Sequence, residues 1–543
     1  MSAFQRFDLN GQAATPSEIA RRWRDFHRAV RRHSPTAFAR LLGPLLGDDT
    51  LRRRVAERLR PTPPAPVPRR ADLVTSFPEN YVARNVLTRS PPPLSDDVEF
   101  VVVDSSDPHE LDEKFRAALT SSKEWLLIVR DADDCHEVAA TLLAYGEGAD
   151  VVYGDEIGDT PIIPLLKPPE IGPHSLLSYN VVGRPALLRR DVVARANGLR
   201  PDARRAAEHD LYLRLLEARA TFRHAPLVLP GRTPSERHDA TLSGDTRRVV
   251  HDALERRGVR AQVDATSRAS VVTWTPQLEA WPTIDILIPT RDRVELLRQC
   301  VESVEASSYP NYSITILDND SSEASTLTYL RSTPHRVVAS PGPFNYAAII
   351  NRGVARCTGE YVVTLNNDTL VRTGDWLEQM VVVASLDDVS IVGVTLIDQH
   401  DTHEHDGIVI APYPQHLRRG INYLVDDDFA LARRDVAAVT GAVQMVSREQ
   451  YVELGGMDEH LAVVMNDVDL CLRSQVKGRH VVMLPDVVLS HFAGSSRGRL
   501  DPVADRDYFV RRWDVFGALR DPYFPETLRL YGSTMEYHPV VSD

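Results

Sequence analysis

Between residues 284 and 484 the sequence repeats one pattern, in which a short apolar run is followed by polar residues and then by a helix-like stretch. The apolar runs have strand length and occupy 284–288, 314–317, 361–365, 391–395 and 481–484. Strands that alternate with helices are typical of an α/β fold with a mostly parallel, Rossmann-like sheet. Ligands bind such sheets where the strands end. The residues directly after each run are therefore the first candidates for a site.

Carboxylate and amide side chains follow three of these runs, and two more aspartates and a histidine come later. One aspartate at a strand end commonly caps the next helix. The presence of such polar residues at three strand ends, together with the later residues, favours a binding or catalytic site. The candidates are Pro289, Thr290, Arg291, Asp292, Asp318, Asp320, Asn366, Asn367, Asp368, Asp467, Asp469 and His491.

These residue types suit the displacement of a nucleoside diphosphate from a sugar. The leaving pyrophosphate accumulates negative charge, which a divalent cation such as Mg²⁺ or Mn²⁺, held by oxygen ligands, stabilises. A separate carboxylate must take the proton from the attacking hydroxyl. The chain supplies carboxylates for both tasks.

Several segments, in this order, resemble the family 2 glycosyltransferases with the GT-A fold, specifically the rhamnosyltransferase-like and O-antigen-type members. IDILIPTRDRVELLRQCVESV is similar to that family's first strand and helix, and YPNYSITILDNDSSE to its second strand. GEYVVTLNNDTLV is similar to its D-x-D strand. AVTGAVQMVSREQYVELGGMDE with NDVDLCLR resembles the acceptor loop and E-D motif, and SHFAGSSRG the closing loop. The resemblance spans about 284–500.

The resemblance implies a role for each candidate. Asp318 matches the residue that grips the nucleobase, and Asn366 and Asp368 take the metal and diphosphate positions. Asp467 matches the catalytic base, and His491 a further metal or phosphate ligand. The remaining positions of the nucleotide-sugar site are Pro289, Thr290, Arg291, Asp292, Asp320 and Asn367.

The motifs depart from the family pattern at two positions. Asn366 replaces the first carboxylate of D-x-D, which shifts metal binding toward Asp368 and His491. Asn466 replaces the glutamate before the base. Asp467 and Asp469 could instead cap their own helix, an interpretation that we favour for Asp469 only.

The predicted activity is an inverting transfer of a sugar from a nucleoside diphosphate sugar (a UDP- or dTDP-sugar) to a glycan or lipid-linked glycan in polysaccharide synthesis. One base without a second nucleophilic carboxylate indicates a single displacement. A sugar nucleotidyltransferase would need a glycine-rich basic loop after the first strand, and PTRDRVELL contains no glycine. A non-catalytic carbohydrate-binding scaffold stays open as a different class.

Residues 97–235 resemble a second, degenerate GT-A module of the kind found in two-module members of the family. EFVVVDSSD is similar to the base-binding strand with Asp104, and EWLLIVRDADD to a D-x-D strand with Asp131 and Asp133. A first strand with its P-x-x-x-R turn is missing, and in EHDLYLRL Glu208 occupies the position of the base. We predict a non-catalytic module, with a bifunctional enzyme as the alternative.

The whole chain is predicted to contain two GT-A-like modules in tandem after an N-terminal helical segment. Its predicted divisions are a basic helical segment (1–60), a proline-rich linker (61–96), the degenerate module (97–235), a helical connector (236–280), the catalytic domain (281–500) and a C-terminal helical tail (501–543). A T-x-x-E capping box and an apolar stripe predict a helix over 15–33. Its basic face fits an anionic membrane surface, and its apolar face fits this protein or a second subunit in a homo-oligomer.

The net charge of −13 argues against a general nucleic-acid binder. The sequence lacks an apolar run near the roughly 20 residues that span a bilayer and an N-terminal signal pattern. These features predict a cytoplasmic protein, with peripheral contact at the inner face of the cell membrane left open. His403, His405 and His416 lack a second pair of ligands, so we expect an acceptor-side loop with His405 near the site rather than a zinc site.

Overall fold

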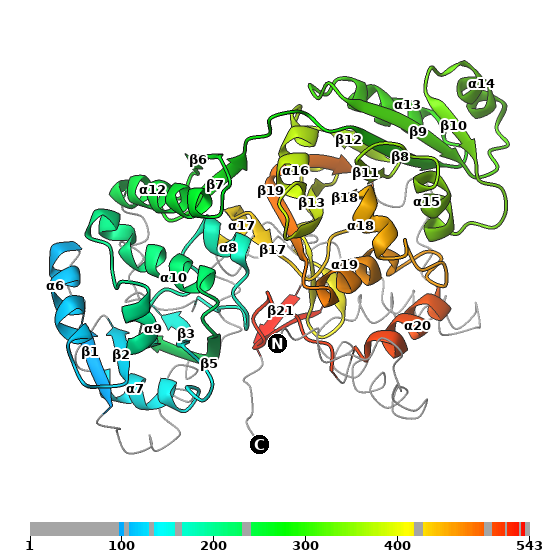
Figure 1. Cartoon of the computed structure of the whole chain (residues 1–543). Helices are drawn as coiled ribbons and strands as arrows, with labels where there is room; N and C mark the ends of the chain where they lie inside the picture. Colours follow the sequence, from blue (N-terminus) through cyan, green and yellow to red (C-terminus); the bar gives the residue numbers. More distant parts are fainter. Residues whose placement is uncertain are drawn as a thin grey trace.

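The chain forms two α/β units that lie side by side (Figure 1). The computed structural model describes residues 97–102, 108–129, 135–157, 165–230, 240–417, 427–492, 502–515, 518–531 and 534–537. The predicted N-terminal helix and proline-rich linker lie outside the described residues, as do Asp104, Asp131 and Asp133. In the part of the chain that the structure describes, no helix has the length and apolarity needed to cross a membrane.

The first unit, residues 97–230, is built on a five-stranded sheet with the order β1-β2-β4-β3-β5. Its strands are β1 (Val98–Val102), β2 (Trp125–Val129), β3 (Val151–Ile157), β4 (Ala186–Arg189) and β5 (Phe222–Pro230). Its helices are α6 (Pro108–Leu119), α7 (Cys135–Leu143), α8 (Pro173–Ser178), α9 (Arg190–Arg195), the 3₁₀ helix η4 (Pro201–Ala206) and α10 (Ala207–Glu217). The β2 run WLLIV is buried along its whole length, as expected for a strand covered by helices on both faces.

The second unit, residues 284–492, is built on a ten-stranded mixed sheet in which β10-β9-β8-β11-β18-β13-β19-β12 form the main path. Its main-path strands are β8 (Ile284–Thr290), β9 (Tyr312–Asp318), β10 (Arg336–Ala339), β11 (Tyr361–Leu365), β12 (Thr369–Val371), β13 (Val389–Ile397), β18 (Val443–Ser447) and β19 (His480–His491). Strands β8, β9, β10 and β11 are parallel, as their alternation with helices predicts. This arrangement brings the candidate strand ends to one edge of the sheet.

Helices and short strands complete the second unit around this sheet. The helices are α13 (Val294–Glu305), α14 (Ala324–Ser332), α15 (Tyr346–Val354), α16 (Trp376–Ala384), α17 (Asp427–Leu431), α18 (Arg448–Glu453) and α19 (Asn466–Val476). The short strands are β14 (His403–His405), β15 (Ile408–Ile410), β16 (Pro414–His416) and β17 (Arg434–Asp435), of which β14 pairs with β13 and β17 with β19.

An internal repeat is visible in one buried ion pair of each unit. Arg214 on α10 contacts Asp210 at 2.8 Å, and Arg473 on α19 contacts Asp469 at 2.7 Å, both one helical turn apart. Each guanidinium also donates to the backbone carbonyl of a glycine in the loop before it, Gly198 at 2.7 Å and Gly456 at 2.8 Å. The same arrangement of side chains therefore joins a helix to the loop before it in both units.

Strand topology corrects one sequence-based interpretation of the first unit. β2-β4-β3-β5 has the same sequence of antiparallel, antiparallel and parallel pairings as β11-β18-β13-β19. β1 lies beside β2 in the place that β8 takes beside β11. The predicted absence of a first strand is therefore wrong. Within the described residues of this unit, it is the counterparts of β9 and β10 that are not found.

The connector and the tail are less helical than predicted. The connector begins with α12 (Ala240–Arg256) but continues as a hairpin of β6 (Ala261–Ala265) and β7 (Val272–Pro276). The tail begins with α20 (Val503–Trp513) and ends as a hairpin of β20 (Leu528–Tyr531) and β21 (Thr534–Tyr537). Both hairpins alternate apolar and polar residues over only four or five positions, which is too short a pattern to separate a strand from a loop.

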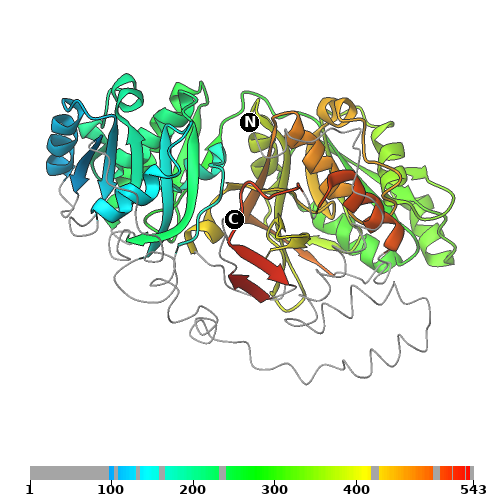
Figure 2. The ribbon, with the colours of Figure 1, turned by 90° about the horizontal axis from the view of Figure 1, so that it is seen from below.

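The two units share apolar packing. One cluster of buried residues runs from the first unit through Val250 and Trp274 of the connector to the second sheet. A smaller cluster joins Val228 of the first unit and Val409 of the second to Phe524 of the tail. Figure 2 shows the C-terminal hairpin, drawn in red, between the units, which agrees with its position in Figure 1.

Candidate active site

The ends of β8, β9 and β11 are tied together by hydrogen bonds. Thr290, the last residue of β8, lies opposite Asp318, the last residue of β9. The Asn367 amide donates to Thr290 Oγ1 at 3.0 Å, and the Asn319 N–H donates to the Thr290 carbonyl at 2.9 Å. Thr290 and Asn367 are both buried. These two side chains therefore help to fix the positions of the loops after β8, β9 and β11 relative to one another.

Asp292 fixes the turn that follows β8. Its backbone is left-handed, with φ of 56°, and its Oδ1 accepts the N–H groups of Ser322 and Glu323, each at 2.7 Å. The Glu323 N–H, followed by the contacts with Ser322, lowers the pKa of this carboxyl. The carboxylate thus joins the β8 turn to the start of α14. Pro289 is half-buried, and Arg291 lies exposed on the same turn.

Asp318 and Asp320 lie on the loop after β9. Asp318 is half-buried, and its Oδ1 accepts the Ser321 N–H at 3.1 Å. Asp320 is exposed, and its Oδ2 accepts the Gly342 N–H at 2.7 Å. Gly342 has φ of +112°, a conformation that favours glycine. Asp320 therefore holds the loop after β10 beside the loop after β9.

Asn366, Asp368 and His491 come together although 125 residues separate the first from the last. His491 ends β19 and pairs with Thr369 of β12. Its Nε2 lies 3.4 Å from Asp368 Oδ1 and 3.4 Å from the Asn366 amide nitrogen. Asp368 is buried, and the His491 side chain is 15% exposed. The cluster therefore faces solvent through His491 and Asn366, both of which are partly exposed.

The donor types of this cluster fit a divalent cation. An imidazole nitrogen and a buried carboxylate oxygen already converge, and a half-turn of the Asn366 amide would present its oxygen beside them. Carboxylate and amide oxygens suit Mg²⁺, and imidazole with carboxylate also suits Mn²⁺. The residues present therefore fit the metal that the sequence predicts, with one carboxylate fewer than D-x-D supplies.

Asp467 lies in the first turn of α19 and is half-buried. Its Oδ2 accepts the Gly441 N–H at 2.8 Å, and its Oδ1 accepts the Val468 N–H at 2.8 Å. The next residue of the same loop, Ala442, accepts the Asn366 N–H through its carbonyl at 2.9 Å. One short loop therefore holds both the predicted base and the predicted metal-binding strand end.

Helix capping does not account for Asp467 or Asp469. The N-cap position of α19 is Met465, in the left-handed conformation with φ of 65°. Asp469 is fully buried between Arg473, Arg512 (Nε to Oδ1, 2.8 Å) and the indole N–H of Trp513 (2.9 Å). The capping role favoured for Asp469 is thus wrong, although a structural role holds, because the residue anchors α20 to α19.

Two hydroxyl groups that the sequence interpretation missed support the loop beneath Asp467. Tyr346 at the start of α15 donates to the Gly441 carbonyl at 2.6 Å, and Thr364 of β11 donates to the same oxygen at 2.8 Å. In the sequence, Asn345 could have indicated the start of this helix, because its side chain caps α15 and so places Tyr346 in the first turn.

We expect Tyr346→Phe to lower kcat several-fold with little change in the donor KM. The loss of one of two donors costs about 1 kcal/mol and leaves the Gly441 carbonyl bonded to Thr364. In the double variant Tyr346→Phe/Thr364→Val that carbonyl loses both donors, so the decrease should exceed the product of the single effects. Steady-state kinetics of the four proteins measure this coupling, and multiplicative effects would show that the two hydroxyls do not share one task.

His405 lies next to this loop, as the sequence predicts. Its Nε2 accepts the Thr440 N–H at 3.4 Å, and its Nδ1 lies 3.1 Å from His416 Nδ1. His405 is buried, and the two rings pack edge to face. The His405–His416 pair therefore lies beside Thr440, the residue before Gly441.

Part of the sequence that forms this site matches a known protein family. Residues 285–440 match the profile of Glycosyl transferase family 2. The second unit is a family 2 glycosyltransferase domain. It has the GT-A fold, and the match includes Asp318, Asn366 and Asp368. The match ends before Asp467 and His491, so their roles stay predictions.

Two curated proteins are similar over longer stretches. The O-antigen biosynthesis protein RfbC of Myxococcus xanthus is 32% identical over 422 residues, which are 73% of this chain and 32% of that protein. The uncharacterized protein y4gI of Sinorhizobium fredii is 34% identical over 272 residues, 47% of this chain and 30% of that protein. The chain thus spans about a third of the length of these relatives.

Among solved structures, the mannosyltransferase PcManGT from Pyrobaculum calidifontis, in complex with GDP-Man and Mn²⁺, is similar at 17% identity and a TM-score of 0.32. The alignment covers 44% of this chain and 64% of the mannosyltransferase.

The first unit differs from the glycosyltransferase domain at the position of the predicted base. The repeated ion pairs align Glu208 of α10 with Asp467 of α19. The Glu208 carboxylate is buried and lies 2.7 Å from Arg184 Nε. Asp467 contacts two backbone N–H groups and is half-buried, whereas Glu208 is engaged by a guanidinium. A proton acceptor held in that way is poorly suited to serve a substrate hydroxyl.

Proposed function

We propose that the chain transfers a sugar from a nucleoside diphosphate sugar to an acceptor hydroxyl with inversion at the anomeric carbon, and that Asp467 is the general base. The observation that carries the proposal is the 440–442 loop, which binds Asp467 through Gly441 and Asn366 through Ala442. A general base must lie close to the reacting hydroxyl, and the bound donor must lie at the same place. The loop provides that proximity.

Each group of residues has a different role in the proposed reaction. The β8 and β9 ends, with Asp318, receive the nucleoside, while Asp368, His491 and Asn366 would hold Mg²⁺ or Mn²⁺ beside the diphosphate. When bound, the cation stabilises the negative charge on the leaving diphosphate. Asp467, oriented by the Gly441 and Val468 N–H groups, takes the proton of the acceptor hydroxyl as that oxygen attacks C1. A single displacement of this kind inverts the anomeric configuration.

We assign a UDP- or dTDP-sugar as donor and a glycan or lipid-linked glycan as acceptor. Similarity to an O-antigen biosynthesis protein supports polysaccharide synthesis as the setting. The purified chain, supplied with Mn²⁺ and a panel of nucleotide sugars, should release nucleoside diphosphate from one or a few of them. If nucleoside diphosphates fail to bind at micromolar concentration with and without Mn²⁺, the scaffold alternative is favoured. The cytoplasmic location, membrane contact and self-association stay predictions.

The buried Arg184–Glu208 pair favours one active site over a bifunctional enzyme. We expect Glu208→Gln to leave the turnover of every accepted donor within about twofold of wild type, because the amide still accepts from Arg184 while it loses basicity. Turnover of the full donor panel by this variant measures the effect. Loss of one transfer reaction with retention of another would instead assign a second active site to the first unit.

A further inference from the structure

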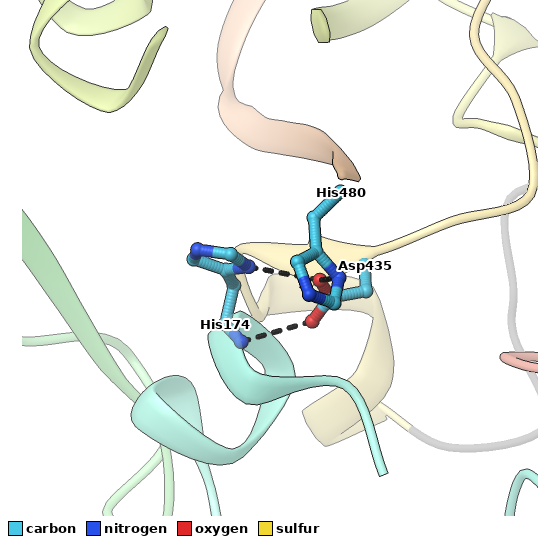
Figure 3. Close-up of side chains that lie close together, drawn as sticks. All are labelled: His174, Asp435 and His480. Carbon is cyan, nitrogen blue, oxygen red and sulfur yellow. Dashed lines mark hydrogen bonds and ion pairs between the residues drawn. The ribbon is translucent and has the colours of Figure 1, made fainter. Parts of the chain in front are cut away.

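Three side chains from both units converge on one point at the boundary between them (Figure 3). His174 lies on α8 of the first unit, and Asp435 and His480 lie on β17 and β19 of the glycosyltransferase domain. His174 Nδ1 is 2.8 Å and His480 Nδ1 is 3.0 Å from the same oxygen, Asp435 Oδ1. All three donor atoms lie within 4.8 Å of one another. His174 and Asp435 are 1% exposed, and the His480 side chain is 22% exposed.

Outer contacts orient two of these side chains in the manner of metal ligands. Histidines that bind metals through one nitrogen usually donate the other ring N–H to a carboxylate or carbonyl. His174 Nε2 lies 3.4 Å from Asp388 Oδ1, which leaves Nδ1 directed at the cluster. Asp435 Oδ2 accepts the N–H groups of His174 and Ser175, each at 2.9 Å, which leaves Oδ1 for the cluster.

The backbone is also built around this carboxylate. A Cβ at Gly172, the N-cap of α8, would overlap the Asp435 carboxylate, so only glycine allows the approach. Asp435 thereby takes the place of the missing capping side chain of α8. The convergence is therefore specified by both units rather than by one flexible side chain.

We propose that His174, Asp435 and His480 bind a zinc-class divalent ion that joins the two units, with solvent in a fourth position. Two imidazole nitrogens and one carboxylate oxygen are typical zinc ligands, at about 2.0–2.2 Å in tetrahedral geometry. Ligand atoms at those lengths are about 3.3 Å apart. The two separations between a histidine nitrogen and Asp435 Oδ1, 2.8 and 3.0 Å, therefore need to open by about half an ångström or less, and the two nitrogens already lie within 4.8 Å of each other. The proposal is independent of the glycosyltransferase activity, because none of the three residues belongs to the predicted active site.

Metal content of the untagged, full-length chain tests the proposal. After incubation with Zn²⁺ and exhaustive dialysis, elemental analysis should find one zinc per chain in wild type and at least a tenfold lower content in His480→Gln. His480 is the most exposed ligand and begins its strand, so this variant should fold. Zinc should also raise the thermal midpoint of wild type, and a chelator should reverse the rise, with no such response in the variant.

Two matched variants make the result specific. His251→Gln removes an exposed histidine from a His-Asp-Glu group on α12 and should keep the zinc. Asp368→Asn alters the predicted catalytic metal site and should also keep it. Wild type without bound zinc, or loss of the zinc in either of these two variants, would overturn the assignment. The first outcome would mean that direct hydrogen bonds, rather than a metal ion, hold these three side chains together.

Discussion

Replacement of Asp467 by asparagine should reduce sugar transfer by about a hundred- to ten-thousand-fold, the usual contribution of a general base. The amide oxygen can still accept the Gly441 N–H, so the loop and the helix α19 should keep their positions. Donor binding should change little, because the base acts on the acceptor hydroxyl. Transfer rates and donor titration by calorimetry measure the two effects separately.

A matched carboxylate controls for charge and folding. Glu449 is exposed in the first turn of α18, and Glu449→Gln removes the same charge from the surface of the same domain. Its transfer rate should equal that of wild type. If Asp467→Asn kept the wild-type rate, another group would be the base, and His405 beside Thr440 would be the next residue to test.

Asp368→Asn should weaken donor binding in the presence of Mn²⁺ by at least about 100-fold. Loss of an outer contact to a metal ligand already costs 10–100-fold in metal affinity, and Asp368 is proposed as a direct ligand. Binding in the absence of Mn²⁺ should stay unchanged, because the β8 and β9 ends that receive the nucleoside are intact. Nucleoside diphosphate titrations with Mn²⁺ and with a chelator measure this difference.

The exposed Asp387 provides the comparison for Asp368. Asp387→Asn should show the wild-type response to Mn²⁺, whereas Asp368→Asn should bind equally with and without the metal. An equal loss of affinity under both conditions would mean that Asp368 supports the fold of the strand end rather than a cation. Thermal unfolding of both variants shows whether the buried carboxylate affects stability.

Local pattern was sufficient to predict β8, β9, β11 and β13 of the second unit. The apolar run Tyr361–Leu365 is a strand with the predicted limits, and β8, β9 and β13 extend the predicted runs by a few residues at their ends. Asn366 and Asp368 follow the same strand β11, so their proximity follows from the sequence itself. His491 was a candidate from its place late in the pattern, but no local feature indicates that β19 and β12 pair and bring it to Asp368.

Contacts between distant segments could not be predicted from local pattern. Tyr346 and Gly441 are 95 residues apart, and His174 and Asp435 are 261 residues apart, with no shared periodicity. The order of strands in the first unit depends on which strand pairs with β2, and that pairing is decided by tertiary packing. Asp469 resembles a capping residue by position, yet Arg512 and Trp513 of α20 decide its role.

The anomeric configuration of the product tests the central proposal most directly. A donor that the chain accepts is incubated with Mn²⁺ and an acceptor, and the new linkage is assigned by NMR. A single displacement with Asp467 as base predicts a linkage of configuration opposite to that of the sugar in the donor. A product that retains the donor configuration would contradict the mechanism, because attack on C1 opposite the leaving diphosphate must invert that centre.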